Sequence, residues 1–447
     1  MVVTLPAVER DWARAARESS TLFDIARAVD GPFHVVHPPT FADNLDRITS
    51  ALAAENIDGM VYFGKKANKA AAWLTQCARP ATGVDVASVP ELVAALGGGI
   101  RGTDIGVTGA AKSDALLWLA MRHDCLIAID EYSELVRLAD LAVRTKLTPR
   151  VLLRIRPPAA PASRFGFGPD ELGDVVAKCA DLRIDLCGFS FHLDGYDPVP
   201  RAELAAELVD RCLRARSLGH RADRISIGGG IACAYVDETD WATFEEGRTD
   251  AWFHAGRNPQ RTYPYYQAPT GADMVTAIAR HESAGISLAE RLRDAGVALL
   301  IEPGRALVDG AGFSVFPVLG CKQSPTAGDI PEHLITTVAG LSMSVSEQWK
   351  GSEFLPDPIL VTPSDPRGRD DGPVYTAVGG SSCMEYDVLT WRLVQLPTTP
   401  RYGDLLVYPN TAGYQMDKNE SEFHQLPLPP KVIWADTSWR FDEGSRP

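Results

Sequence analysis

The sequence lacks the features of membrane, secreted and nucleic-acid-binding proteins. No stretch approaches the roughly 20 consecutive apolar residues that are needed to cross a bilayer. Glu9, Arg10 and Asp11 stand near the start, where a signal peptide has a basic end followed by an apolar core. The formal charge of −14 is opposite in sign to the basic surface that nucleic acids require. We therefore expect a cytoplasmic protein that binds neither membranes nor nucleic acids.

The eight cysteines also lack an organising pattern. They are scattered along the chain, and no two of them form a Cys-x-x-Cys pair. This spacing argues against both a zinc site and a disulfide framework. We expect most of them to be small buried hydrophobic residues in a reducing compartment, and we expect no metal.

The composition is that of an ordinary globular protein, and strand-like runs alternate with helical stretches along the chain. Its 447 residues are 45% hydrophobic and 23% charged, and the length favours two domains. Short apolar runs indicate buried parallel strands at residues 60–63, 84–87, 105–107, 126–129, 151–155, 186–191, 225–227 and 298–301. Helical stretches occupy residues 70–77, 90–96, 113–122, 131–142, 200–217 and 287–295. Eight strands alternating with helices predict a (β/α)8 TIM barrel, although a doubly wound open sheet has the same alternation.

The pattern changes after Arg305. Gly-, Pro- and Asp-rich segments separate strand-like runs, which predict an antiparallel β domain, at residues 313–319, 334–338, 359–361, 374–378, 405–408 and 432–434. Pro317 should make the first run an edge strand or a broken strand. We expect residues 1–35 to pack with the β domain, 36–305 to form the barrel and 306–447 to form the β domain. The aromatic-rich insertion at 232–285 follows the seventh strand, on the functional face of such a barrel.

Lys66 is the most informative single residue. An apolar run ends there at a lysine pair, in the sequence Val-Tyr-Phe-Gly-Lys-Lys-Ala-Asn. A lysine at the mouth of a buried strand can be partly desolvated, which lowers its pKa and lets the neutral amine form a Schiff base with a carbonyl cofactor. Most lysines at strand ends point to solvent, so this interpretation depends on the residues that follow.

Polar residues and glycines recur at the ends of other expected strands. Asp85 lies at the second strand, His192 ends the sixth, Gly228, Gly229 and Gly230 end the seventh, and Glu302 and Arg305 follow the eighth. The carboxyl ends of all barrel strands lie on one face, where active sites of this fold are built. We therefore expect these residues to converge on one site.

Each type of residue at this face suits a particular chemistry. The three glycines let backbone N–H groups approach an anion, and Arg305 offers a planar donor fork to a phosphate. A carboxylate such as Glu302 beside a pyridine nitrogen keeps that nitrogen protonated. His192 can stack on an aromatic cofactor or act as an acid. The alternatives are a tight turn for the glycines, a structural ion pair for Glu302 and Arg305, and a structural role for His192.

Two further candidates lie in the expected β domain. Cys383 follows a Gly-Gly-Ser-Ser stretch, which suggests an exposed loop whose thiol can donate a proton. Tyr414, in Asn-Thr-Ala-Gly-Tyr-Gln, can hydrogen-bond a phosphate. A buried inert thiol and a packed tyrosine are the alternatives.

Taken together, these stretches resemble the fold-type III pyridoxal-phosphate (PLP) decarboxylases, the group of ornithine, arginine and diaminopimelate decarboxylases. The resemblance runs from about residue 30 to about 435. It includes the Lys-Ala-Asn stretch, Gly-Val-Asp-Val-Ala-Ser at 83–88, the triple glycine and Glu-Pro-Gly-Arg at 302–305. The Gly-x-x-Cys-x-x-x-Asp segment and Gly-Asp-Leu-Leu at 403–406 follow in family order.

The resemblance implies a barrel of the alanine racemase type, a C-terminal β domain and a role for each candidate residue. Lys66, not Lys65, would hold PLP as an internal aldimine, with His192 stacked on the ring, Glu302 at its nitrogen and Asp85 also at the cofactor. The phosphate would lie against the three glycines, Gly304, Arg305 and Tyr414. Cys383 of the partner subunit would protonate the carbanion left after CO₂ departs, which implies a homodimer with shared active sites.

The sequence also departs from the family pattern. His-x-Gly-Ser is replaced by His-Leu-Asp-Gly at 192–195, so a serine that would contact the phosphate is missing, and Gly-Ala-Tyr is replaced by Ala-Gly-Tyr at 412–414. Met384 stands where decarboxylases of basic amino acids have an acidic residue, and residues 346–350 lack the arginine that diaminopimelate decarboxylases place there. Glu347 or Glu385 remains available to bind a distal amine, and both also suit a surface position.

The resulting hypothesis is PLP-dependent decarboxylation of an amino acid through a quinonoid, giving the amine and CO₂. An amino-acid racemase on the same fold is the first alternative, and Glu302 argues against it because racemases of this fold place an arginine there. A decarboxylase of a carrier-protein-bound aminoacyl group and a non-catalytic PLP-binding regulator are the others. The substrate is not determined by the sequence.

Overall fold

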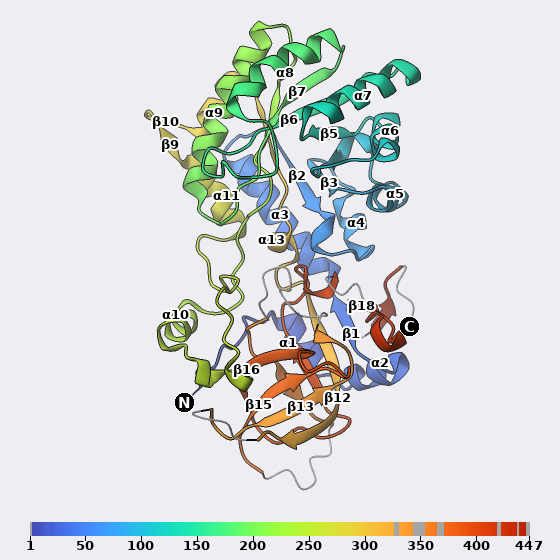
Figure 1. The fold of residues 1–447 in the computed structure, drawn as a ribbon, viewed down its shortest axis with the longest axis vertical. Coiled ribbons are helices and arrows are strands. Elements are labelled where there is room, and N and C mark those ends of the chain that lie inside the picture. Colours follow the sequence, from blue (N-terminus) through green and yellow to red (C-terminus); the bar gives the residue numbers. More distant parts are fainter. Residues whose placement is uncertain are drawn as a thin grey trace. The chain divides into compact units, whose positions relative to one another are not determined.

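The computed structural model describes residues 2–325, 330–342, 354–363, 371–417, 422–435 and 438–443 (Figure 1). The chain divides into two compact units. We call the first the barrel unit, which contains residues 42–232 and 269–307. We call the second the β unit, which contains residues 1–41, 233–268 and 308–447.

The barrel unit is a closed barrel of parallel strands. Its strands are β2 (Gly59–Gly64), β3 (Thr82–Val86), β4 (Ile105–Val107), β5 (Leu126–Ile129), β6 (Arg150–Arg154), β7 (Asp185–Ser190), β8 (Arg224–Ser226) and β11 (Ala298–Ile301). The last strand, β11, pairs with both β8 and β2, which closes the barrel and excludes the open sheet. The predicted (β/α)8 barrel is confirmed, because every expected strand run falls on one of these strands.

Helices alternate with the barrel strands (Figure 1). They are α3 (Pro38–Ala54), which starts in the β unit, α4 (Ala72–Cys77), α5 (Val89–Gly97), α6 (Asp114–Arg122), α7 (Tyr132–Thr145), α8 (Pro169–Asp181), α9 (Pro198–Ser217), α11 (Gly271–Arg280), α12 (Leu288–Ala295) and α13 (Arg305–Val308). Ser88 caps α5 by accepting a hydrogen bond from the N–H of Glu91, and Ser287 forms a capping box with Glu290. The sequence analysis did not predict α8.

Short elements complete the barrel unit. They are the one-turn helices η1 (Lys65–Ala67) and η2 (Gly102–Asp104) and the hairpin strands β9 (Glu282–Ser283) and β10 (Ile286–Ser287). Apolar side chains from five barrel strands, among them Tyr62, Leu152 and Leu300, pack together as one core cluster. Burial of these side chains fixes the strand ends that carry the candidate site residues.

The β unit is built on a mixed sheet. Its described strands are β1 (Phe33–Val36), β12 (Gly312–Gln323), β13 (Leu334–Val338), β14 (Ile359–Val361), β15 (Val374–Gly379), β16 (Val388–Leu396), β17 (Leu405–Tyr408), β18 (Lys431–Ala435) and β19 (Ser438–Phe441). Most neighbouring strands pair antiparallel, as expected, but the sheet is mixed, because β1 pairs parallel to β18 and β13 pairs parallel to β15. These partners are distant in sequence, so no hairpin turn determines their relative direction.

The expectation that Pro317 makes its run an edge strand or a broken strand is wrong. Strand β12 continues from Gly312 to Gln323 and pairs with β1, β17 and β13. On one side its partner changes from β1, which ends opposite Val315, to β13, which begins opposite Val318. Pro317 lies at this change of partner, where the amide hydrogen that proline lacks is not needed by the ladder.

Helices and part of the aromatic-rich insertion complete the β unit. They include α1 (Asp11–Glu18), α2 (Thr21–Val29), α10 (Glu238–Gly247), η3 (Asp250–Trp252), η4 (His254–Gly256), η7 (Gln415–Asp417) and η8 (Phe423–Gln425). Tyr235, Tyr263 and Tyr265 of the insertion form edge-to-face contacts with one another, and Tyr235 and Tyr265 also contact Phe354. Residues 233–268 therefore contribute to the core of the β unit, whereas α11 of the same insertion belongs to the barrel unit.

The lengths of the described helices and the state of the cysteines bear on the expectations from composition. None of the helices in the described part of the chain is long and apolar enough to span a bilayer. All eight cysteines are free thiols; six are buried, Cys321 is half-buried and Cys383 is exposed.

Candidate active site

The turn after β2 separates the two neighbouring lysines. Lys65 is buried, and its Nζ donates to the carbonyl oxygen of Lys69 at 3.2 Å. The Lys66 side chain is 48% exposed, and its Nζ lies 3.9 Å from Oδ2 of Asp85. The structure therefore places Lys66, rather than Lys65, with its amine at the mouth of the barrel.

Asp85 is a buried carboxyl group at the end of β3. Its Oδ1 accepts a hydrogen bond from Thr108 Oγ1 at 2.7 Å. Burial and the charge of Glu302 raise the pKa of Asp85 to about 7, against the opposing effects of Lys66 and Thr108. Asp85 can therefore hold or release a proton beside the Lys66 amine near neutral pH. Thr108 carried no signal in the sequence.

His192 contacts the glycine turn formed by Gly228, Gly229 and Gly230. The N–H of Gly229 donates to His192 Nδ1 at 3.2 Å, which requires Nδ1 to be unprotonated. Removal from bulk water, together with nearby cations including Lys66, lowers the pKa of His192 below its ordinary value. The imidazole is therefore neutral at neutral pH, although part of the residue is open to solvent.

The glycine turn has no room for side chains. A Cβ on Gly228 would lie 2.7 Å from the carbonyl oxygen of Phe191, and one on Gly229 would lie 2.9 Å from that of Glu302. Gly228 and Gly230 also have φ angles of +66° and +79°. The atoms that would meet these Cβ positions belong to the protein itself, so the glycines allow the turn to pack closely against its neighbours.

Glu302 is held in place from two directions. Ser226 Oγ donates to Glu302 Oε1 at 2.6 Å, and the N–H of Glu302 donates to the carbonyl oxygen of Gly228 at 2.9 Å. Ser226 was not among the expected site residues, because a serine inside a β strand carries no distinctive sequence signal.

Arg305 begins α13, directly after the buried Gly304. Its Nη1 lies 3.4 Å from the hydroxyl oxygen of Tyr196, to which it donates. Tyr196 follows the His-Leu-Asp-Gly segment that departs from the family pattern, and it was not predicted. Within the barrel unit the structure thus brings together Lys66, Asp85, His192, the glycine turn, Glu302 and Arg305 at the carboxyl ends of the strands.

The remaining candidates belong to the β unit. Cys383 and Glu385 are exposed, and the side chain of Met384 is also exposed. Tyr414 adopts a left-handed backbone conformation with φ of +76°. Glu347 lies outside the described residues.

The loop that carries Cys383 is held by Asp387. The Asp387 carboxylate accepts hydrogen bonds from the N–H groups of Ser342 at 2.7 Å and Ser382 at 3.0 Å. Cys383 Sγ lies 3.3 Å from Nε2 of His424, a residue that the sequence analysis missed. The thiol is therefore presented to solvent with an imidazole beside it.

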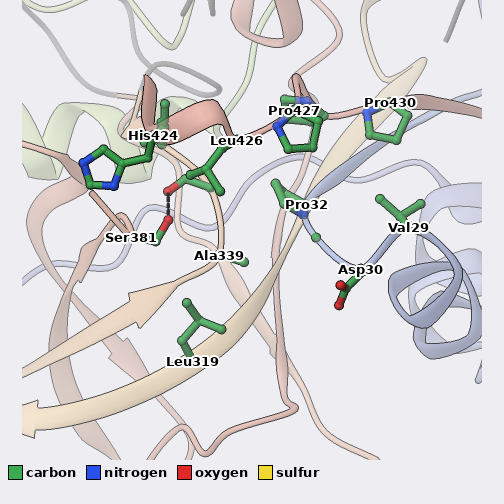
Figure 2. A pocket seen from close by; sticks show the side chains of 14 residues that line it. Val29, Asp30, Pro32, Leu319, Ala339, Ser381, His424, Leu426, Pro427 and Pro430 are labelled. Atoms are coloured by element: carbon green, nitrogen blue, oxygen red, sulfur yellow. Dashed lines mark hydrogen bonds between the residues drawn. The ribbon is translucent and has the colours of Figure 1, made fainter. Parts of the chain in front are cut away.

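A pocket of about 250 Å³ lies in the β unit beside this histidine (Figure 2). Most of its wall is apolar, with Leu319, Leu341 and Leu426 among the lining residues. Ser381 and His424 also line it, and Ser381 Oγ donates to the carbonyl oxygen of Gly340 at 3.1 Å. His424 is thus shared between the pocket wall and the Cys383 thiol.

The residues at the barrel mouth fit PLP. Lys66 offers an amine, the glycine turn and Arg305 suit a phosphate, and Glu302 is an oriented carboxylate for a pyridine nitrogen. The neutral imidazole of His192 adds a flat surface without a competing positive charge. Each part of the cofactor thus has a matching group on the same face of the barrel.

Comparisons with known proteins agree with this chemistry. The family model described as "pyridoxal-dependent decarboxylase, pyridoxal binding domain" matches residues 42–255. The chain is 35% identical over 412 residues to an uncharacterized protein, y4yA, of Sinorhizobium fredii, with 92% of this chain and 89% of that protein covered. It is 24% identical over 401 residues to a diaminopimelate decarboxylase of Deinococcus radiodurans, with 86% of each covered.

A solved structure shows the same architecture. The diaminopimelate decarboxylase of M. jannaschii, in complex with L-lysine, matches with a TM-score of 0.74 at 18% identity, covering 94% of this chain and 91% of that one. This likeness confirms the barrel with its additional β domain. The chain is therefore a distant member of the fold-type III PLP-dependent decarboxylases, a family of carboxy-lyases whose cofactor is pyridoxal phosphate.

Proposed function

We propose that the protein decarboxylates an amino acid, releasing CO₂ and the corresponding amine. The observation that carries this proposal is the position of the Lys66 amine, 3.9 Å from the buried Asp85 carboxyl at the barrel mouth. When bound, PLP supplies an electron-poor pyridine ring that accepts the electron pair left when the bond between Cα and the carboxylate breaks. Lys66 would hold the cofactor covalently through its amine.

Glu302 keeps the ring nitrogen of the cofactor protonated in this proposal. Its Oε1 accepts the 2.6 Å hydrogen bond from Ser226, and its backbone is tied to Gly228, so the carboxylate is oriented before the cofactor binds. An acidic partner at the ring nitrogen favours decarboxylation over racemisation, because it preserves the electron-accepting form of the ring. Racemase activity is therefore the weaker alternative.

The other candidate residues bind the cofactor or move a proton. His192 stacks on the ring, and the glycine turn, Gly304, Arg305 and Tyr414 hold the phosphate. Cys383 of the partner subunit delivers a proton to Cα, with a homodimer as the functional assembly. The support is the exposed thiol on a loop that Asp387 holds in place.

The substrate is proposed to be an amino acid other than diaminopimelate. The side chain of Met384 is 44% exposed next to Cys383, where decarboxylases of basic amino acids have an acidic residue. Glu385 and Glu347 are the remaining candidates for binding a distal amine. We also propose a cytoplasmic location, which the eight free thiols support.

The test is a PLP titration followed by a screen for products. Purified protein with PLP should develop a visible absorbance band, and borohydride should fix the cofactor to Lys66, which peptide mass spectrometry can identify. Lys66→Ala should abolish the adduct and CO₂ release, whereas Lys69→Ala, a change at a neighbouring exposed lysine, should preserve both.

The screen covers L- and D-amino acids and measures CO₂, amine and inverted substrate separately. CO₂ and amine from one substrate class support the proposal and name that class. Inverted substrate without CO₂ would establish a racemase instead, and cofactor fixed at a residue other than Lys66 would contradict the proposed site.

A further inference from the structure

Arg201 is a buried cation behind the candidate phosphate site. It lies in the first turns of α9 and is only 1% exposed. Its Nη2 donates to the carbonyl oxygens of Leu193 at 3.0 Å and Gly195 at 2.7 Å. These carbonyls belong to the segment that directly follows His192, so Arg201 holds the backbone of that segment in place.

The charge of Arg201 has no direct counter-ion among the described residues. None of the ion pairs among the described residues includes its guanidinium, and its buried Nε has no hydrogen-bond partner there. Burial lowers the pKa of Arg201, against the nearby Tyr196, Asp194 and Asp197, but an arginine stays charged at neutral pH. A buried charge without a direct counter-ion is costly, so a bound anion near Arg201 would be favoured.

The nearest place for such an anion is the glycine turn. A Cβ built on Gly230 would lie 1.8 Å from Arg201 Nη2, so the guanidinium packs directly against the Gly230 backbone. The N–H of Gly228 donates to Ser226 Oγ and that of Gly229 to His192 Nδ1. Among the described residues, no acceptor takes the N–H of Gly230.

The same segment is where the sequence departs from its family. Asp194 and Gly195 replace the Gly-Ser pair, so a serine hydroxyl that would contact the phosphate is absent. Arg201 instead binds the carbonyl oxygen of Gly195 and places a positive charge against Gly230. The buried charge of Arg201 thus lies against the segment that lacks the serine.

We propose that Arg201 is a positioning residue that ties the 193–195 segment to the glycine turn and makes the site selective for a phosphate-bearing cofactor. The inference rests on the proposed placement of the phosphate at Gly228, Gly229 and Gly230. Its effect on the phosphate is electrostatic and acts through the Gly230 backbone. We therefore expect substitution of Arg201 to change the ratio of PLP affinity to pyridoxal affinity, because the two compounds differ only in the phosphate.

The experiment measures equilibrium binding of PLP and of pyridoxal to the cofactor-free protein by absorbance titration. Arg201→Gln should weaken PLP binding by about tenfold, the order expected for losing one charge near an anion. Pyridoxal binding should change by less than a factor of about two, because pyridoxal has no phosphate for the charge to attract. Arg201→Lys should recover part of the loss for PLP, since it restores the charge but not the donor fork.

Arg305→Gln is the matched control, because Arg305 is proposed to contact the phosphate directly. It should also lower affinity for PLP but not for pyridoxal. If neither variant changes the selectivity, the phosphate lies elsewhere and the proposed site fails. If Arg305→Gln changes it while Arg201→Gln weakens both ligands equally, Arg201 is only structural and the inference is overturned.

Thermal unfolding of the cofactor-free variants checks that they fold. If Arg201→Gln does not fold, the comparison uses Arg201→Lys, which keeps the charge in a less constrained position. Its ratio of PLP affinity to pyridoxal affinity should fall severalfold. An unchanged ratio would overturn the proposal.

Discussion

Gly230→Ala places a methyl group where the structure has an arginine side chain. The added Cβ would lie 1.8 Å from Arg201 Nη2, far inside van der Waals contact, and Gly230 has a φ of +79°. The guanidinium cannot move away without breaking its hydrogen bonds to Leu193 and Gly195. The substitution therefore combines backbone strain with the loss of a buried polar network.

The size of the effect follows from these two parts. A non-glycine residue in the left-handed region costs about 1–2 kcal/mol. Each hydrogen bond from a charged group contributes about 1.5–3 kcal/mol, so losing both brings the total to about 4–8 kcal/mol. That is a large fraction of the roughly 5–15 kcal/mol that stabilises a folded protein.

The assay is urea unfolding of the cofactor-free protein, with Gly219→Ala as the matched control. Gly219 has a φ of +91° and nothing within 4 Å of its virtual Cβ, so its substitution should cost only the strain of about 1–2 kcal/mol. In an Arg201→Ala background, the loss in free energy of unfolding caused by Gly230→Ala should fall to a value similar to that of Gly219→Ala. Equal destabilisation by Gly230→Ala and Gly219→Ala in the wild-type background would refute the reasoning.

Three further predictions concern protons. Burial, with the nearby charge of Lys431, lowers the pKa of His34 to about 3, so below pH 6.5 the unfolded chain binds a proton that the native state does not. The free energy of unfolding should thus fall by about 2 kcal/mol between pH 6.5 and 5, and urea unfolding should show a smaller decline in His34→Gln; an equal decline in both proteins would contradict this. Asp85 should give the opposite pH dependence of the free energy of unfolding, because its pKa is raised to about 7 by burial and by Glu302. Its stabilising contribution is complete below about pH 4 and is lost as the pH rises through 7, so Asp85→Asn should flatten that decline in the cofactor-free protein, and an unaltered slope would count against it. Finally, His424→Gln should slow alkylation of Cys383 by iodoacetamide at pH 7.5 severalfold, because His424 Nε2 lies 3.3 Å from Sγ and can accept the thiol proton; mass spectrometry of the labelled peptide at equal times tests this, and equal labelling would refute it.

Much of the barrel could be predicted because its strands are buried on both faces. Such strands are short, continuous apolar runs, and three of them, at 105–107, 126–129 and 298–301, have the same bounds in the structure as in the sequence pattern. Helix caps are also local interactions: the Ser88 side chain that starts α5 accepts from the N–H of Glu91, three positions away. Helix α8 was missed, although its buried residues Leu172, Val175, Val176 and Cys179 repeat at the i, i+3, i+4, i+7 spacing of an amphipathic helix.

The β unit was harder to predict, because its pairings join distant segments. Strand β1, from residues 33–36, lies between β12 and β18, some 280 and 400 residues further along the chain. The effect of Pro317 depended on which strand adjoins it, and the place of residues 233–268 depended on which core accepts their aromatic side chains. None of these follows from local composition.

The sequence by itself determined the residue types that carry distinctive chemistry and their positions at strand ends: Lys66, Asp85, His192, the glycine turn, Glu302 and Arg305. These are readable because parallel strands deliver their carboxyl ends to one face whatever the details of packing. Only the tertiary structure decided which supporting residues act on them. Thr108, Ser226, Tyr196, Arg201 and His424 are ordinary residue types, and they acquire roles only because closure of the barrel and pairing of the sheet bring them within hydrogen-bond distance of particular partners.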